Sequence, residues 1–214
     1  MVGGISVVYA TVFNMPVSDL LPFIGLGIMI WMLISTTLAD ACKAYVANRA
    51  VILEMPLPYS HYVLKTIATN VMVTAHHMVV VVPIVLILDH NLTWQTLLFV
   101  PGLLLLFANL FWAASFLALI CARFHDITLV VASVIQLAIF VTPIFWRPEM
   151  LEGRRSFILD ANPFYHLIAV VRQPILGNAA PDFSYIFLSV TAVLGISLVG
   201  FLHKNYRKRI VFWI

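Results

Sequence analysis

Long apolar segments alternate with short polar ones along this chain of 214 residues. Charged residues are so sparse that several uncharged stretches extend over about 20 residues or more. A helix needs about 20 apolar residues to cross the hydrocarbon core of a bilayer, and in lipid its backbone hydrogen bonds must be made internally. The pattern therefore predicts an all-α polytopic membrane protein. The complete spans that we predict are residues 20–39, 66–88, 96–122, 127–145 and 183–202.

A sixth apolar run covers residues 1–15. Fifteen helical residues reach only about 22 Å, whereas the hydrocarbon core is about 30 Å thick. A signal peptide is an alternative, but this run has no basic start and Asn14-Met15-Pro16-Val17 is a poor cleavage sequence. We interpret the run as the outer part of a first span whose beginning is missing. Residues 1–214 then form a single transmembrane domain of six spans, the first of them truncated.

Composition and charge agree with this interpretation. Hydrophobic residues make up 63% of the chain and charged residues 10%, with a mean hydropathy of +1.03, whereas an ordinary soluble domain carries about 25% charged residues. Cytoplasmic loops of membrane proteins are enriched in Lys and Arg. We therefore place both termini in the cytoplasm, because most basic residues then lie on the inner side. These residues are Lys43, Arg49, Lys65, Arg123, Lys204, Arg207, Lys208 and Arg209.

The sequence lacks the motifs that would give the chain its own chemistry. It has no phosphate-binding loop Gly-x-x-x-x-Gly-Lys-Ser/Thr, no His-Glu-x-x-His zinc motif and no Gly-x-Ser-x-Gly nucleophile elbow. The pI is near 9.0, but the basic residues cluster at membrane borders, so we expect no nucleic-acid partner. No Asp, Glu, Lys or Arg lies inside a predicted span, which argues against an ion-coupled transporter. We expect no enzyme activity, cofactor or metal, and a subunit that takes its energy from a partner.

His76 and His77 lie inside a predicted span, where ionisable side chains are candidates for function. Successive residues of a helix point about 100° apart, so the two rings cannot chelate one metal together. Neutral histidines packed between helices are the simpler interpretation. A membrane anchor for a haem or a quinone, using His76 and His166, is the alternative function.

The predicted cytoplasmic loop, residues 40–65, contains helix-forming residues up to Pro56, which stops them. Apolar residues within this loop lie beside Arg49 and Glu54. Apolar groups on a water-facing loop indicate burial against a partner protein, and a loop lying back on the membrane interface is the alternative. The apolar residues are Val51, Leu53, Met55 and Leu57.

The predicted outer segment, residues 146–182, contains one amphipathic helix. Asn162-Pro163 has the form of an N-cap followed by proline at the first helical position, and Pro174 with Gly177 ends the helix. Such a helix is too short to span the bilayer but suits a re-entrant or interfacial position. Arg172 either reaches lipid headgroups or binds an anionic group of a substrate. The apolar side is Phe164, Leu167, Ile168, Val171 and Ile175, and the polar side is Tyr165, His166, Arg172 and Gln173.

Aromatic residues are frequent inside the predicted spans. Their rings offer flat surfaces for the apolar faces of sugars and need no charge to hold them. Packing in the core or against lipid is the simpler role for any one of them. The candidates for an aromatic substrate channel are Trp31, Phe111, Trp112, Phe116, Phe140 and Phe145.

Three sequence blocks resemble the C-terminal half of type-2 ABC export permeases. The chain is most similar to the permeases that export polysaccharides, namely O-antigen, capsule and teichoic acid precursors. The resemblance extends over nearly the whole chain. The blocks are Arg123-Phe124-His125-Asp126-Ile127, Thr142-Pro143-Ile144-Phe145-Trp146 and Asn162-Pro163-Phe164-Tyr165-His166-Leu167-Ile168, followed by Arg172 and Leu176-Gly177.

This resemblance implies a permease subunit in the inner membrane of a bacterium that moves a lipid-linked polysaccharide outward. It implies a homodimer with a lined channel, driven by two separate ATP-binding subunits. A permease of the same architecture that exports a drug or another lipid is the alternative. The family also has a cytoplasmic amphipathic helix and a full first span, which the opening Met1-Val2-Gly3-Gly4 does not match.

The resemblance also assigns roles to two segments. Residues 44–58 become the loop that couples to the ATPase, and residues 146–182 become re-entrant periplasmic gate helices. The expected coupling residues are Asn48, Arg49, Leu53 and Glu54, and the expected gate residues are Asn162, Pro163, Phe164 and Arg172.

Overall fold

The computed structural model describes residues 2–13, 16–55, 57–87, 93–148 and 156–214, and within these ranges every regular element is a helix. Parts of the predicted first and third spans, the coupling loop and the gate segment (1, 14–15, 56, 88–92 and 149–155) lie outside the described residues. The helices are α1 (Val2–Phe13), α2 (Val17–Ala41), α3 (Ala44–Ala47), α4 (Arg49–Glu54), α5 (Tyr59–Ile87), the 3₁₀ helix η1 (Trp94–Leu98), α6 (Phe99–Arg123), α7 (Ile127–Val141), α8 (Ser156–Asp160), α9 (Pro163–Ile175) and α10 (Asp182–Ile210).

The all-helical, multi-pass architecture agrees with the sequence. Three described segments are long and apolar enough to cross a bilayer, namely Val17–Ala41, Trp94–Arg123 and Asp182–Ile210. α5 has 29 residues and is therefore about 43 Å long. α7 has 15 residues and α1 has 12, which gives about 22 Å and 18 Å. The count of six spans therefore stays a prediction.

α7 ends four residues before the predicted boundary at residue 145. Its C-cap, Thr142, has an extended backbone with φ −86° and ψ 133°. The residue before a proline is disfavoured in the helical region, and Pro143 also lacks the N–H that a helix needs. The Thr-Pro-Ile-Phe-Trp block is consequently a buried turn rather than the last turn of a span.

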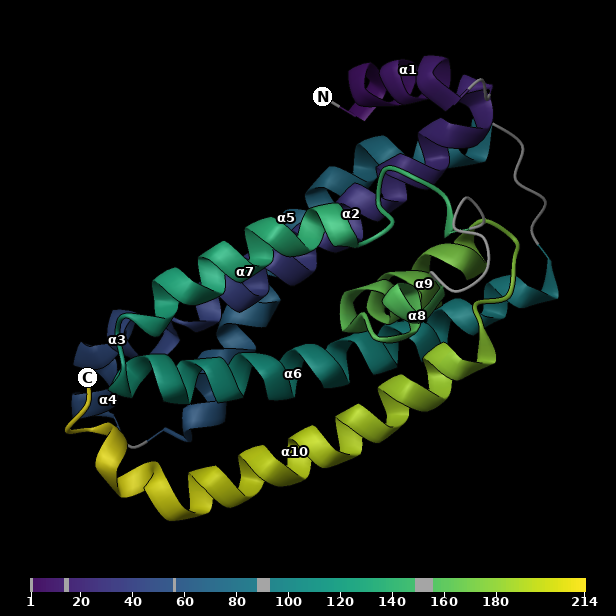
Figure 1. Cartoon of the computed structure of the whole chain (residues 1–214). Helices are drawn as coiled ribbons and strands as arrows, with labels where there is room; N and C mark the ends of the chain where they lie inside the picture. Colours follow the sequence, from purple (N-terminus) through teal and green to yellow (C-terminus); the bar gives the residue numbers. More distant parts are fainter. Residues whose placement is uncertain (1, 14–15, 56, 88–92, 149–155) are drawn as a thin grey trace.

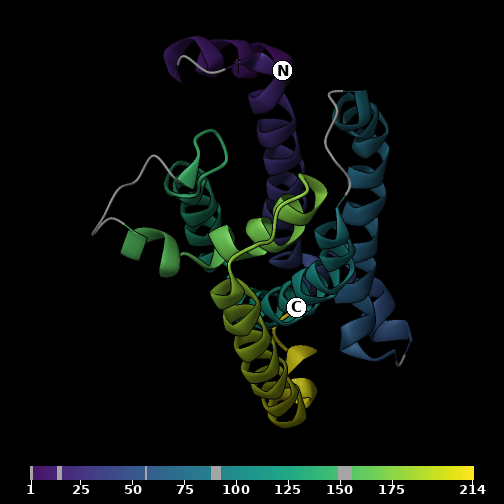
Figure 2. The ribbon, with the colours of Figure 1, turned by 90° about the vertical axis from the view of Figure 1, so that its right-hand side faces the viewer.

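The two ends of the molecule carry different elements. α3, α4 and the C-terminus lie together at one end, which we call the basal end, whereas α1 and η1 lie toward the other, distal end (Figure 1). At the basal end, Tyr45, Tyr62 and Ile210 belong to one buried apolar cluster. At the distal end, α1 crosses the end of α2 instead of running alongside it (Figure 2). α9 lies near the middle of the molecule in the same view.

Two glycines allow neighbouring helices to approach closely. A Cβ atom added to Gly102 of α6 would overlap the carbonyl oxygen of Val170 in α9, and one added to Gly195 of α10 would overlap the indole ring of Trp112 in α6. Small residues at helix contacts are typical of membrane proteins, because packing rather than the hydrophobic effect holds the helices together. α6 is therefore fitted against α9 on one side and α10 on another.

Asn109 of α6 adds a polar contact between α6 and α10. Its Nδ2 donates to the Leu188 carbonyl oxygen at 3.0 Å. Its Oδ1 accepts from Trp112 Nε1 and from Thr191 Oγ1, both at 2.9 Å. Such interhelical bonds are worth about 0.6 kcal/mol on average in lipid, so their main effect is to fix the register of the two helices.

We expect Gly102→Ala to destabilise the protein by about 1–3 kcal/mol, because the new methyl group meets rigid backbone and overpacks the contact. The free energy of unfolding in mixed detergent micelles measures this. Gly200→Ala is the matched control, because a Cβ at Gly200 meets nothing within 4 Å and both changes raise helix propensity equally. Equal stability of the two variants would contradict the close contact of α6 with α9.

Candidate functional site

α9 is a short helix with well-formed ends. Asn162 caps it, because its Oδ1 accepts from the backbone N–H groups of Phe164 at 3.0 Å and Tyr165 at 3.3 Å. At the other end Gly177 adopts a positive φ of 74°. The N–H of Gly177 donates to Pro174, and that of Asn178 donates to Gln173, which is a Schellman arrangement. The predicted start at Asn162-Pro163 and end near Gly177 are therefore confirmed.

The surroundings of α9 differ from the prediction of an interfacial amphipathic helix. The side chains from Tyr165 to Arg172 are all buried. α9 contributes to the largest apolar cluster together with α2, α6 and α10, for example through Ile168, Ile34 and Leu106. The predicted polar side faces the protein and not water or headgroups. His166 and the Nη1 of Arg172 have hydrogen-bond partners within the fold.

Arg172 is fully buried, with 0% of its surface exposed. Its Nη1 donates to the Pro143 carbonyl oxygen at 2.9 Å, and its guanidinium carbon lies 3.7 Å from the centroid of the Phe23 ring. The same Nη1 lies close to Gly27, where an added Cβ would come within 3.1 Å. Arg172 therefore joins α9 to α2 and to the turn after α7. Of the two predicted roles, reaching lipid headgroups is wrong, because the side chain points into the protein.

Asn162 and His166 attach α9 to other elements. Asn162 Nδ2 donates to Thr142 Oγ1 at 3.1 Å, which links the cap to the end of α7. His166 Nε2 lies 3.0 Å from the Asp160 carbonyl oxygen, an acceptor, so Nε2 carries the hydrogen and Nδ1 accepts from Ser184 Oγ at 2.9 Å. Both ring nitrogens of His166 are thus engaged, and neither is available to ligate a haem iron in this arrangement.

The other predicted gate residues lie at the start of α9. Pro163 is exposed at the first helical position. Phe164 is half-buried and packs edge-on against Trp31 of α2, with ring centroids 5.4 Å apart. Trp31 lies in the middle of α2, so α9 reaches as deep as the centre of that helix.

The basal end carries the predicted coupling segment. α3 is buried through Ala44 and Tyr45, whereas no residue of α4 is buried. Arg49 and Glu54 are exposed, and Leu53 and Met55 are each 54% exposed. Val51, Leu53, Met55 and Leu57, which we call the basal apolar surface, are all exposed.

The helices behind this surface are firmly attached. Burial raises the pKa of the Tyr45 phenol, so its hydroxyl stays protonated. His203 Nδ1 lies 3.0 Å from the Val199 carbonyl oxygen and donates to it, which leaves Nε2 to accept from the Tyr45 hydroxyl at 2.9 Å. Asn48, predicted as a contact residue, accepts from Lys65 Nζ at 2.8 Å. Its side chain therefore connects the α3–α4 junction to α5.

The predicted channel aromatics lie in different surroundings. Trp31 is buried and Phe145 stacks on Tyr9 of α1, with centroids 5.6 Å apart. Trp112 is held against Gly195 of α10. Phe140 is 72% exposed on α7. Phe111 and Phe116 are half-buried on α6. Within one chain these rings do not share one apolar cluster, and their role in a channel stays a prediction.

Sequence reasoning missed several residues that complete these sites. Thr142 and Pro143 belong to the Thr142–Trp146 block, but the sequence does not show that they contact α9. Phe23 and Gly27 gave no signal, because one apolar residue and one glycine in a span look like many others.

His76 is exposed and His77 half-buried on α5, with ring centroids 6.2 Å apart.

The fold and these sites define a class: a multi-pass helical membrane protein with an exposed apolar surface at one end and a buried short helix toward the other. The family model described as ABC-2 type transporter matches residues 3–176, and the chain belongs to this family. The resemblance read from the sequence is thereby confirmed. Members of the family are the membrane subunits of transporters, which work with an ABC ATPase.

A curated relative is the O-antigen export system permease protein RfbA of Myxococcus xanthus. The two sequences are 24% identical over 186 residues, which cover 82% of this chain and 70% of the relative. The similarity extends over most of both chains. This chain is therefore similar to a protein that is named as a permease for O-antigen export.

We expect a measurable interaction between Arg172 and Phe23. A cation over a ring in desolvated surroundings is worth about 2 kcal/mol. Phe23→Leu should therefore lower the free energy of unfolding by about 1–2 kcal/mol more in the wild-type protein than in the Arg172→Met variant. A double-mutant cycle on the free energy of unfolding measures this difference. Pairing Arg172→Met with Leu38→Ala, fifteen residues further along α2, should give additive effects. Additivity in the first cycle would contradict the contact.

Proposed function

We propose that this chain is the membrane permease subunit of an exporter that moves a lipid-linked polysaccharide outward across the bacterial inner membrane. Two copies of the chain form the channel, and two ATP-binding subunits drive it. The family assignment and the named function of the relative support this proposal. The observation that carries it is the basal apolar surface, which is exposed although the elements behind it are buried and hydrogen-bonded.

The basal apolar surface is the docking site for the ATPase in this proposal. Leu53 and Met55 enter a groove of the partner, while Arg49 and Glu54 form charged contacts around them. Apolar contacts supply most of the binding energy, and charged contacts at the rim set specificity and association rate. Asn48 supports this surface from behind through Lys65.

The proposed topology has six spans, with both termini in the cytoplasm and α8 and α9 as re-entrant gate helices on the periplasmic side. The depth of α9 supports this arrangement, because Phe164 reaches Trp31 at the middle of α2. Backbone at membrane depth is tolerated where protein surrounds it, and α9 is surrounded by α2, α6 and α10.

Sugars pass along aromatic side chains in this proposal. Phe164 covers Trp31, so Trp31 becomes available to a sugar only when α9 moves. Phe111, Trp112, Phe116, Phe140 and Phe145 continue the path once two copies of the chain are assembled. Each ring binds a stacked sugar unit with only modest affinity, so a long polymer can pass from one ring to the next.

Leu53→Asp should abolish both ATPase binding and export, because an aspartate at the centre of an apolar contact loses its hydration without gaining a partner. Co-purification with the ABC ATPase measures binding. Complementation of a strain that lacks its O-antigen export permease tests whether the chain exports this glycan. Trp94→Asp at the start of η1, 88% exposed at the distal end and outside the predicted span 96–122, is the control and should retain both.

Two results would contradict the proposal in different ways, one from transport by the purified chain and one from the complementation assay. Transport by the purified chain without an ATPase would contradict the proposal that ATP-binding subunits drive it. ATPase binding without any glycan export, in a strain that supplies the glycan, would leave the permease assignment standing and point to a drug or another lipid as cargo.

We also expect Leu53→Cys, in a chain with Cys42→Ala and Cys121→Ala that is expressed without the ABC ATPase, to resist a membrane-impermeant thiol reagent in intact cells. The basal end faces the cytoplasm in the proposed topology, so labelling should appear only after permeabilisation. Trp94→Cys at the distal end, 88% exposed in the wild type, should label in intact spheroplasts. The reverse pattern would invert the topology and end the coupling model.

A further inference from the structure

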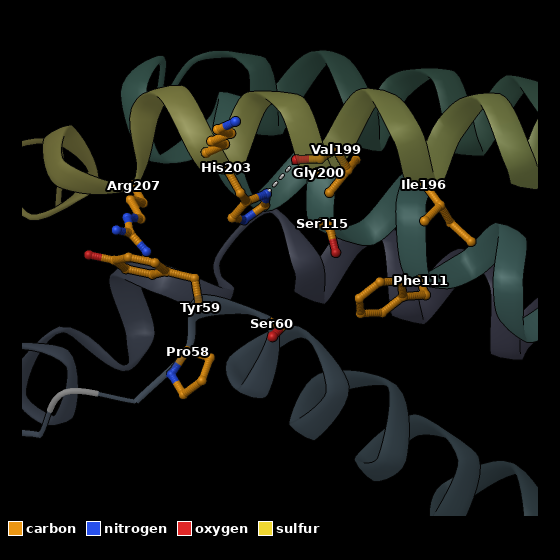
Figure 3. A pocket seen from close by; sticks show the side chains of 11 residues that line it. Pro58, Tyr59, Ser60, Phe111, Ser115, Ile196, Val199, Gly200, His203 and Arg207 are labelled. Carbon is orange, nitrogen blue, oxygen red and sulfur yellow. Dashed lines mark hydrogen bonds between the residues drawn. The ribbon is translucent and has the colours of Figure 1, made fainter.

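A cavity of about 610 Å³ lies at the basal end between α10, α6 and the start of α5 (Figure 3). Its lining changes from charged to apolar along α10. Lys204 and Arg207, both exposed, line the end nearest the C-terminus. Ile196 of α10 and Phe111 of α6 line the other end and lie opposite one another (Figure 3). The cavity thus joins a cationic mouth to an apolar interior.

The dimensions of this cavity match one leaflet of a membrane. Ile196 and Arg207 are eleven residues apart on α10, which corresponds to about 16 Å along the helix. Half of the hydrocarbon core of a bilayer is about 15 Å thick. A molecule with an anionic head at Arg207 and an apolar chain reaching Ile196 would therefore extend from the membrane surface to the bilayer centre.

Ser115 marks the boundary between the two parts. This residue lines the cavity, is only 1% exposed, and its Oγ has no hydrogen-bond partner among the described residues. In Figure 3 its hydroxyl points into the space between His203 and Phe111. Buried hydroxyl groups are normally hydrogen-bonded. His203 does not serve it, since both ring nitrogens already bond Tyr45 and Val199.

We propose that this cavity binds one anionic diacyl phospholipid of the basal leaflet. Lys204 and Arg207 hold the phosphate, Ser115 donates to an ester carbonyl, and one acyl chain lies along Phe111 and Ile196. The order of these groups in the cavity is their order in the lipid, where the ester lies between phosphate and chain. A polyisoprenyl phosphate shares the phosphate and the apolar chain but lacks the ester that Ser115 would serve.

The first test measures lipid binding to the delipidated full chain in detergent by native mass spectrometry. Phosphatidylglycerol should bind in one tightly held copy, and diacylglycerol with the same chains should not. Lys204→Gln with Arg207→Gln should weaken binding by about 25-fold, taking about fivefold for each basic residue near a lipid surface. Lys208→Gln with Arg209→Gln removes equal charge from residues that do not line the cavity, and should weaken binding much less, because these exposed charges make no contact with the phosphate and solvent ions screen them. Equal losses in both pairs would overturn the proposal.

The second test addresses the lipid class. Wild-type chain should bind the ester lipid about fivefold more tightly than its ether analogue, as expected for one hydrogen bond, and Ser115→Ala should remove this difference. A polyisoprenyl phosphate should bind no better than the ether lipid, and inorganic phosphate should not compete. Tighter binding of the polyisoprenyl phosphate than of phosphatidylglycerol, or equal binding of ester and ether lipids to the wild type, would overturn the assignment.

A third variant separates binding from folding. Gly200 lines the cavity and has open space around it, so Gly200→Leu should fill the cavity and expel the lipid while the protein stays monodisperse. Retention of the lipid in this variant would contradict the site. The inference depends on membrane insertion and not on the cargo, so a failure of glycan export leaves it unaffected.

Discussion

The buried guanidinium of Arg172 is the constraint on which the distal half of the molecule depends. A cation removed from water costs several kcal/mol unless the protein replaces its hydration. Here the Pro143 carbonyl and the Phe23 ring take part in that replacement, and they come from the turn after α7 and from α2. α9 therefore cannot shift away from either element without uncovering a charge. Any movement of α9 must carry Pro143 and Phe23 with it or offer Arg172 new partners.

α2 connects this constraint to the basal end. The helix has 25 residues and is about 37 Å long, and it continues into α3 through Cys42, whose backbone is helical. Phe23, in the distal half of α2, and Trp31, near its middle, contact α9. Tyr45 of α3 is hydrogen-bonded to His203 beside the basal apolar surface. Coupling between distant sites travels through rigid elements with two arrangements. In the proposed exporter, α2 behaves as a nearly rigid rod. A displacement of α4 would therefore move α2 and, through it, α9.

The sequence predicted the helices well and the partners of their polar groups poorly. Uncharged stretches of membrane length mark the long apolar helices α2, α6 and α10, because lipid permits few alternatives to a helix, and Asn162-Pro163 with Gly177 marks α9 because capping is local. The surroundings of α9 were missed for a physical reason. A helical pattern separates apolar from polar sides but does not say whether protein, lipid or water covers the polar side. Phe23, Thr142 and Ser184 meet α9 only through tertiary packing, and a single sequence holds no record of it.

The basic residues that set the predicted orientation have further structural roles at the basal end. Lys65 supports Asn48, and Arg123 lies over the rings of Phe124 and Trp213, at 5.0 and 5.3 Å from their centroids. Lys204 and Arg207 border the cavity proposed for a phospholipid. Positive charge near a membrane surface is usually explained by insertion alone. Here Lys65 also holds Asn48 at the junction of α3 and α4, and Lys204 and Arg207 border the cavity in which we propose that a phospholipid binds. His203 lines the same cavity and bonds Tyr45 of α3, so in this proposal a lipid in the cavity would lie next to the contact that holds α3.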